Sequence, residues 1–170
     1  MFNNSLEKIN LLYIDKDNES NNNVLTVLNQ RFDSITFCSE NSNPLEQFNL
    51  CDPDIVLINI DIPKIDSVTV IKKIREIDAG IPILVITSQD NSAKCVDTIL
   101  LNINNYVVEP IDADSLISKL TYYAKGLFCE IEKNDYAKIL QNVINSDKNL
   151  LIATNGERIL FSNKTFLEFF

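Results

Sequence analysis

The sequence predicts an α/β protein with a doubly wound, five-stranded parallel sheet and helices on both of its faces. Two observations support this fold class. Five short apolar runs alternate with segments of helical length, and three of the runs consist almost entirely of Val, Ile and Leu. Such runs are typical of strands that are covered on both faces of a parallel sheet. The right-handed crossovers between parallel strands then place helices on both faces.

Five strands are predicted in the first two thirds of the chain. They are the runs INLLYI (9–14), SITFC (34–38), DIVLIN (54–59), PILVIT (82–87) and NYVV (105–108). The connections between them carry apolar residues at helical spacing, which predicts a helix in each connection. These helices are expected over 19–32, 43–50, 67–77 and 92–101. Their apolar stripes include Val24, Leu25, Leu28, Val70, Ile71, Ile74, Ile77, Cys95 and Ile99.

A long helix is predicted after the fifth strand, from near Asp112 to about residue 146. Because an average helix has about 11–12 residues, one small domain covers only part of such a helix. The second half carries the apolar residues Tyr136, Ile139, Leu140, Val143 and Ile144. We expect this half to pair with a second copy of the chain, which predicts a homodimer. The alternative is that the segment beyond the helix folds back and covers it within one chain.

That segment, NLLIATNGERILFSNKTFLEFF, predicts a β-hairpin followed by a helix. Asn155-Gly156 is a strong hairpin signal between two short apolar runs, and Asn163 can cap the helix that follows. A lone hairpin is marginal in water. The segment is therefore interpreted as the beginning of a second domain.

Composition limits the classes of function. The net charge of −9 disfavours a nucleic-acid partner, and no apolar run is long enough to span a membrane. The four cysteines are widely scattered, so we expect reduced thiols in a cytoplasmic protein. The chain contains no His, which excludes a phosphohistidine relay within it. No metal or other cofactor is predicted.

Polar residues follow four of the predicted strands. In a doubly wound sheet, ligands and chemistry lie beyond the carboxyl ends of the strands. The residues at these ends are Asp15, Lys16, Asp17, Asn59, Thr87, Ser88, Glu109 and Pro110. The acids in the loop after Asn59, Asp61 and Asp66, are interpreted as solvated, and Asp17 as a cap of the first helix.

The runs LLYIDKD, PDIVLINIDIPKID, IPILVITS and NNYVVEPID, in this order, resemble the receiver domain of two-component response regulators over roughly residues 9–120. The resemblance implies a flavodoxin-like sheet of order 2-1-3-4-5. It also implies an acidic pair after the first strand that holds Mg²⁺, and an Asp after the third that accepts phosphate from a histidine kinase. A hydroxyl follows the fourth strand, and a Lys precedes a cis-proline after the fifth.

Against that pattern the site is degenerate. Asp15 keeps the first acidic position, but Lys16 replaces the second, Asn59 the phosphoacceptor and Glu109 the lysine. Thr87 keeps the hydroxyl, and Tyr106 keeps the aromatic position associated with switching and output. An amide cannot form an acyl phosphate, and its neutral oxygen is a poor Mg²⁺ ligand. The Lys16 ammonium is expected either between Asp15 and Glu109 or in water.

The resemblance suggests three segments: a receiver-like domain (1–120), a signalling helix (121–146) and the truncated start of a PAS-like domain (147–170). The expected function is that of a pseudo-receiver without enzymatic activity, which acts on signalling proteins such as a histidine kinase or a downstream output domain. One alternative is a response regulator phosphorylated on another acid, such as Asp61 or Asp15. Another is a flavodoxin-like small-molecule binder, although the loops lack a glycine-rich phosphate cradle.

Overall fold

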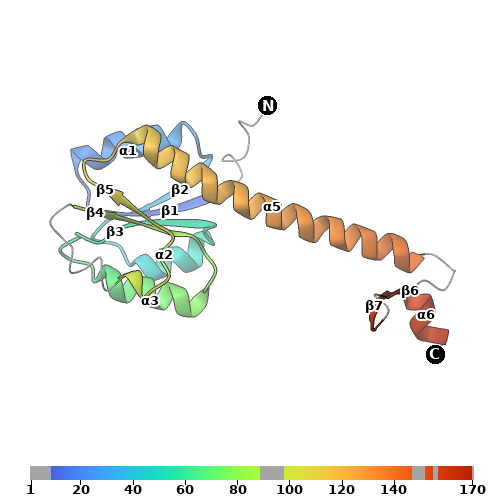
Figure 1. Ribbon diagram of the computed structural model, residues 1–170. Coiled ribbons are helices and arrows are strands. Elements are labelled where there is room, and N and C mark those ends of the chain that lie inside the picture. Colours follow the sequence, from blue (N-terminus) through green and yellow to red (C-terminus); the bar gives the residue numbers. More distant parts are fainter. Residues whose placement is uncertain (1–8, 89–97, 147–151, 155–156, 170) are drawn as a thin grey trace. The chain divides into compact units, whose positions relative to one another are not determined.

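The computed structural model describes residues 9–88, 98–146, 152–154 and 157–169 (Figure 1). Contacts within the chain divide it into two units, Met1–Gly126 and Leu127–Phe170. Within the described residues no helix combines the length and the apolar character needed to cross a bilayer.

The first unit contains the predicted parallel sheet. Its strands are β1 (Asn10–Ile14), β2 (Ser34–Cys38), β3 (Ile55–Asn59), β4 (Ile83–Thr87) and β5 (Asn105–Val108). They are all parallel and lie in the order β2-β1-β3-β4-β5. The predicted fold class and strand order are therefore confirmed.

Helices cover both faces of this sheet. They are α1 (Glu19–Asn29), α2 (Pro44–Cys51), α3 (Ser67–Ile77) and the beginning of α5 (Ala113–Ser146). Figure 1 shows α1 and the beginning of α5 over one face, and α2 and α3 over the other. Between β4 and β5, Thr98 and Ile99 are helical, whereas Cys95 lies outside the described residues.

The core is formed chiefly by the three central strands. All residues of β3 and β4 are buried, as are four of the five residues of β1. The helical stripes were predicted less well than the strands. Ile77 ends α3 and is 55% exposed, and Ile99 is 60% exposed, so both expectations of burial were wrong.

Asparagine and aspartate side chains cap the helices. The Asn18 side chain accepts a hydrogen bond from the backbone N–H of Asn21, so Asn18, and not Asp17, caps α1. Asp66 caps α3 through the backbone N–H of Thr69. These caps satisfy N–H groups that the helix itself leaves unpaired.

The second unit contains the predicted hairpin. Strands β6 (Ile152–Thr154) and β7 (Ile159–Ser162) pair in antiparallel fashion, while the turn residues Asn155 and Gly156 lie outside the described residues. Helix α6 (Lys164–Phe169) follows, and the Asn163 side chain accepts from the Phe166 N–H at 3.0 Å. The hairpin and the Asn163 cap are both confirmed.

Matched Leu→Ala substitutions test the position of the core. Leu57 lies in the centre of β3 and is fully buried, so Leu57→Ala should destabilise the protein by about 2–5 kcal/mol. Leu50 on α2 is 72% exposed, and Leu50→Ala should change stability by no more than about 0.5 kcal/mol. Urea unfolding followed by far-UV circular dichroism measures both. Equal losses of stability would contradict the burial of β3.

Candidate functional site

The polar residues identified in the sequence lie at the carboxyl edge of the sheet. Asn59 is the last residue of β3 and pairs with Ile86 of β4, and Thr87 ends β4 opposite Val108 of β5. The Glu109 N–H donates to the Thr87 carbonyl at 2.9 Å. The carboxyl ends of these parallel strands therefore lie side by side.

Asp15 is a fully buried carboxylate held by neutral donors. Its Oδ2 accepts from the Tyr13 hydroxyl at 2.8 Å, and its Oδ1 accepts from the Lys16 backbone N–H at 2.7 Å. Burial raises the pKa of Asp15 above its ordinary value, and hydrogen bonds from Tyr13, Lys16 and Asn21 offset part of the increase. Burial, reinforced by the charge of Asp15, also raises the pKa of Tyr13. Tyr13 was not identified from the sequence, where it reads as an ordinary strand residue.

Lys16 does not form the ion pair that the sequence left open. No ion pair within 4.0 Å joins its ammonium to Asp15 or Glu109, all three of which are described residues. Lys16 and Glu109 instead line one pocket of about 580 Å³, beside residues of α1 and the segment 110–113.

Asn59 is fully buried, and both ends of its amide are engaged. Its Nδ2 donates to Glu109 Oε1 at 3.4 Å, and its Oδ1 accepts from the Asp61 N–H at 2.7 Å. The Ser67 hydroxyl also donates to the Asn59 carbonyl at 2.9 Å. An amide can make these contacts because it is both a donor and an acceptor. An ionised carboxylate could not donate to Glu109.

Asp61 was interpreted as a solvated loop acid, and this was wrong. Its side chain is partly buried, and its Oδ2 accepts from the Ser88 backbone N–H at 2.7 Å. The bond joins the loop after β3 to the end of β4. The sequence carries no signal for it, because the contact depends on how two loops approach each other. Asp66, by contrast, is exposed and serves as a helix cap.

Thr87 and Tyr106 lie on β4 and β5. Thr87 is buried, and its hydroxyl donates to the Ser88 carbonyl at 3.1 Å. The Tyr106 hydroxyl is 2.8 Å from the Thr98 hydroxyl, and its carbonyl accepts a hydrogen bond from the Lys119 ammonium. Glu109 and Pro110 are joined by the cis peptide bond that the resemblance implied.

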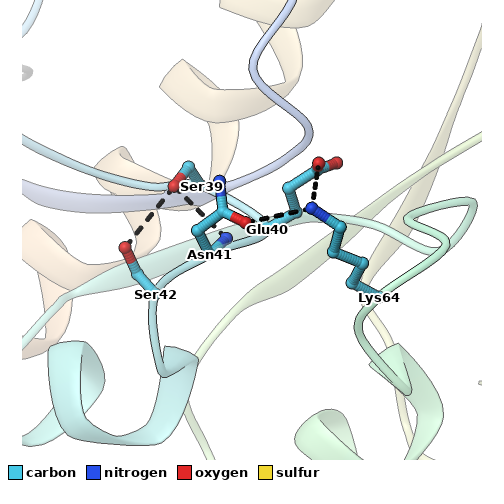
Figure 2. Close-up of polar contacts among 5 residues, drawn as sticks. All are labelled: Ser39, Glu40, Asn41, Ser42 and Lys64. Atoms are coloured by element: carbon cyan, nitrogen blue, oxygen red, sulfur yellow. Dashed lines mark hydrogen bonds and ion pairs between the residues drawn. The ribbon is translucent and has the colours of Figure 1, made fainter.

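The loop after β3 is also tied to the loop after β2 (Figure 2). The Lys64 ammonium lies 3.1 Å from Glu40 Oε1 and donates to Asn41 Oδ1 at 3.0 Å. The Asn41 N–H in turn donates to the Ser39 hydroxyl at 3.4 Å. Lys64 is 60% exposed, so this ion pair adds only a modest restraint.

The donor set does not fit the Mg²⁺ that the resemblance implies. Hard, strongly hydrated Mg²⁺ requires oxygen ligands with free lone pairs, chiefly carboxylates. Of the three acids that the resemblance implies, only Asp15 remains, because position 16 is a Lys and the residue at position 59 is an Asn whose neutral Oδ1 accepts from the Asp61 N–H. In the part of the chain that the structure describes, no three His, Cys, Asp or Glu side chains cluster as metal ligands.

Comparisons with known sequences agree with this fold. The family model of the response regulator receiver domain matches residues 11–121. The chain is 24% identical over 89 residues to the chemotaxis protein CheY of Bacillus subtilis. The aligned region covers 52% of this chain and 74% of that protein. It is 27% identical over 110 residues to the response regulator protein GraR of Staphylococcus epidermidis, covering 65% of this chain and 49% of that protein. The chain thus spans about half the length of GraR.

Solved structures show the same architecture. The N-terminal domain of an uncharacterized protein from Wolinella succinogenes superposes with a TM-score of 0.66 at 17% identity, covering 72% of this chain and 98% of that one. A CheY-like receiver domain protein from Methanospirillum hungatei gives a TM-score of 0.63 at 13% identity, covering 72% and 99%. At sequence identities below 20%, the similarity to these two structures shows a shared fold. With the family model matched over most of the sheet and its helices, the chain belongs to the response regulator receiver domain family.

Proposed function

We propose that this receiver domain is a pseudo-receiver, which transmits a two-component signal by binding other proteins and does not accept phosphate at residue 59. The observation that carries the proposal is the Asn59 amide, which is buried and hydrogen-bonded at both ends. Acyl phosphate formation requires a carboxylate oxygen that can attack phosphorus. Asn59 has none, and its one oxygen is already bonded to Asp61.

The substitutions at positions 59 and 109 support each other. If residue 59 were an ionised carboxylate, it would face Glu109 across the 3.4 Å that now separates Asn59 Nδ2 from Glu109 Oε1. At an effective dielectric constant of about 20, two such charges repel by roughly 5 kcal/mol. Glu109 is therefore compatible with an amide at position 59 and opposes an acid there.

The two alternative acids suit phosphorylation poorly. Asp15 has no exposed surface, and both of its oxygens accept hydrogen bonds. Asp61 is bonded to the Ser88 N–H. The membership in the receiver family also favours a signalling module over a flavodoxin-like small-molecule binder. A flavin absorbance spectrum of the purified protein tests that last alternative.

The partners belong to the same proposal. A histidine kinase or an output domain is the expected partner, because GraR and similar relatives are named as response regulators. We propose that residues 121–146 act as a signalling helix and that residues 147–170 begin a PAS-like domain, in a cytoplasmic protein. The hairpin β6-β7 and the capped helix α6 are compatible with such a beginning.

Dimerisation through the second half of α5 is also proposed. Ile139 on α5 is 57% exposed, and Ile144 is partly buried. In the same unit Ile152, Ile159 and Leu167 are 47%, 56% and 67% exposed. Apolar side chains of this size in water favour a partner surface. The side chains of Tyr136, Leu140 and Val143 lie outside the described residues.

Acetyl phosphate with Mg²⁺ tests the central proposal. The protein should show no gain of a phosphoryl group in its intact mass, because residue 59 lacks a nucleophilic carboxylate. The matched control is the triple variant Lys16→Asp, Asn59→Asp, Glu109→Lys, which restores the acidic pair, the acceptor and the lysine. This variant should gain one phosphoryl group. A phosphoryl gain on the unaltered protein would overturn the proposal, and peptide mapping would then identify the acid involved.

Asp15→Asn tests the structural role of that acid. Because burial raises the pKa of Asp15, the folded protein binds this proton more tightly than the unfolded chain does. Ionised Asp15 therefore lowers stability, by an amount that grows as pH rises above the ordinary value of 3.8 and levels off above the raised pKa.

The stability of the unaltered protein relative to Asp15→Asn should accordingly fall as the pH rises from 3.8 toward neutrality, because only the unaltered protein carries the titrating group. Urea unfolding at a series of pH values measures this difference. The control is Asp17→Asn, at an exposed acid in the same loop, which should show a much smaller effect. A stability difference between the two proteins that stays constant with pH would contradict the raised pKa of Asp15.

Light scattering tests the dimer. At tens of micromolar the chain should have twice its mass of 19.3 kDa. Ile139→Lys should weaken the dimer more than tenfold, because two copies of a buried Ile contribute about 3 kcal/mol or more. Gln141→Lys adds the same charge on the other side of α5 and should have little effect. A monomer mass for the unaltered chain, or equal weakening by both variants, would contradict an interface at Ile139.

A further inference from the structure

The carboxylate of Asp61 adds a side-chain connection between the ends of β3 and β4, beyond the backbone hydrogen bond from the Ile60 N–H to the Ile86 carbonyl. Its own N–H donates to Asn59 Oδ1, and its Oδ2 accepts from the Ser88 N–H, both at 2.7 Å. Ser88 directly follows β4, and Asn59 ends β3. The side chain therefore bridges the carboxyl ends of two adjacent strands.

This bridge is part of a longer network. Glu109 accepts from Asn59, Asn59 accepts from the Asp61 N–H, and Asp61 accepts from Ser88. The network runs across the ends of β5, β3 and β4. In this network the backbone N–H of Ser88 donates to a carboxylate. A hydrogen bond to an ionised acceptor is roughly twice as strong as a neutral one.

The surrounding contacts fix the loop that carries Asp61. The Ser67 hydroxyl bonds the Asn59 carbonyl, and Lys64 reaches Glu40 and Asn41 on the loop after β2 (Figure 2). Ile60 and Ile62, on either side of Asp61, are 1% exposed. The backbone on both sides of Asp61 is thus anchored, which reduces the entropy lost when its carboxylate binds Ser88.

We infer that Asp61 is a positioning residue that acts as the resident anion of this site, binding the Ser88 N–H in place of any external oxyanion. The inference rests on the proposed function, since Asn59 leaves no residue at the end of β3 on which a covalent anion could form. A carboxylate built into the loop supplies a permanent negative group instead. The ends of β3 and β4 are then held in one arrangement without modification of the protein.

The amide resonance of Ser88 tests this inference in the full chain. Hydrogen exchange and ¹H–¹⁵N shifts are compared for the unaltered protein, Asp61→Asn and Asp61→Ala, with the exposed Asp17→Asn as control. The Ser88 N–H should exchange about tenfold or more faster in Asp61→Ala, since a bond to a charged acceptor is lost. Asp61→Asn keeps a neutral acceptor of the same shape and should lie in between. Asp17→Asn should match the unaltered protein.

Formate separates an anion site from a merely structural contact. In Asp61→Ala, sodium formate should return the Ser88 resonance toward its original shift and slow its exchange, whereas sodium chloride at equal ionic strength should not. Unaltered protein should not respond to formate at Ser88. If the Ser88 resonance is unchanged in Asp61→Ala, or if formate has no effect there, the inference is overturned. Phosphorylation of the unaltered protein by acetyl phosphate would instead refute the proposed function, while these Ser88 measurements keep their own outcome.

Discussion

The buried amide of Asn59 is the interaction on which the carboxyl edge of this sheet depends. It donates to Glu109 and accepts from Asp61, so a single side chain links the ends of β5 and β3. Asp61 extends the link to β4 through Ser88. A carboxylate at position 59 would lose the donor and face the charge of Glu109. The neighbours of residue 59 therefore favour an amide over an acid at this position.

Asp15, at the end of β1 on the other side of β3, is likewise hydrogen-bonded to groups of the protein itself. Its carboxylate accepts hydrogen bonds from the Tyr13 hydroxyl and from the Lys16 N–H. Burial of a charge is unfavourable unless hydrogen bonds replace its hydration, and these neutral donors supply that replacement in part. Asp15 and Asn59 thus both direct their polar atoms at the protein itself. These polar groups form hydrogen bonds within the edge of the sheet.

The fold could be predicted because apolar pattern and strand length carry most of the information. The run DIVLIN contains β3, which begins one residue later than predicted. The run NYVV forms β5 with the predicted bounds. Once parallel strands were predicted, it also followed that Asn59 and Glu109 lie at the same edge of the sheet. The capping role of Asn163 was readable because it depends only on nearby residues.

The connections within the site could not be predicted. The Asp61–Ser88 bond joins loops 27 residues apart, and its formation depends on how two loops approach each other. The sequence suggested an ion pair between Asp15 and Lys16. In the structure the Asp15 carboxylate instead accepts a hydrogen bond from the hydroxyl of Tyr13, two residues earlier. Ile77 and Ile99 matched helical spacing, yet both are largely exposed. Their exposure could not be predicted, because an apolar stripe does not show where a helix stops contacting the sheet.

In the proposed function, this receiver has one arrangement of its strand ends, which is maintained without phosphate. The most direct measurement is a ¹H–¹⁵N spectrum of the unaltered protein with and without beryllofluoride and Mg²⁺, which together imitate a phosphorylated aspartate. The account predicts that the amide signals of Asn59, Thr87, Ser88 and Tyr106 stay where they are. A second set of signals at these residues, in slow exchange with the first and growing with beryllofluoride, would contradict it.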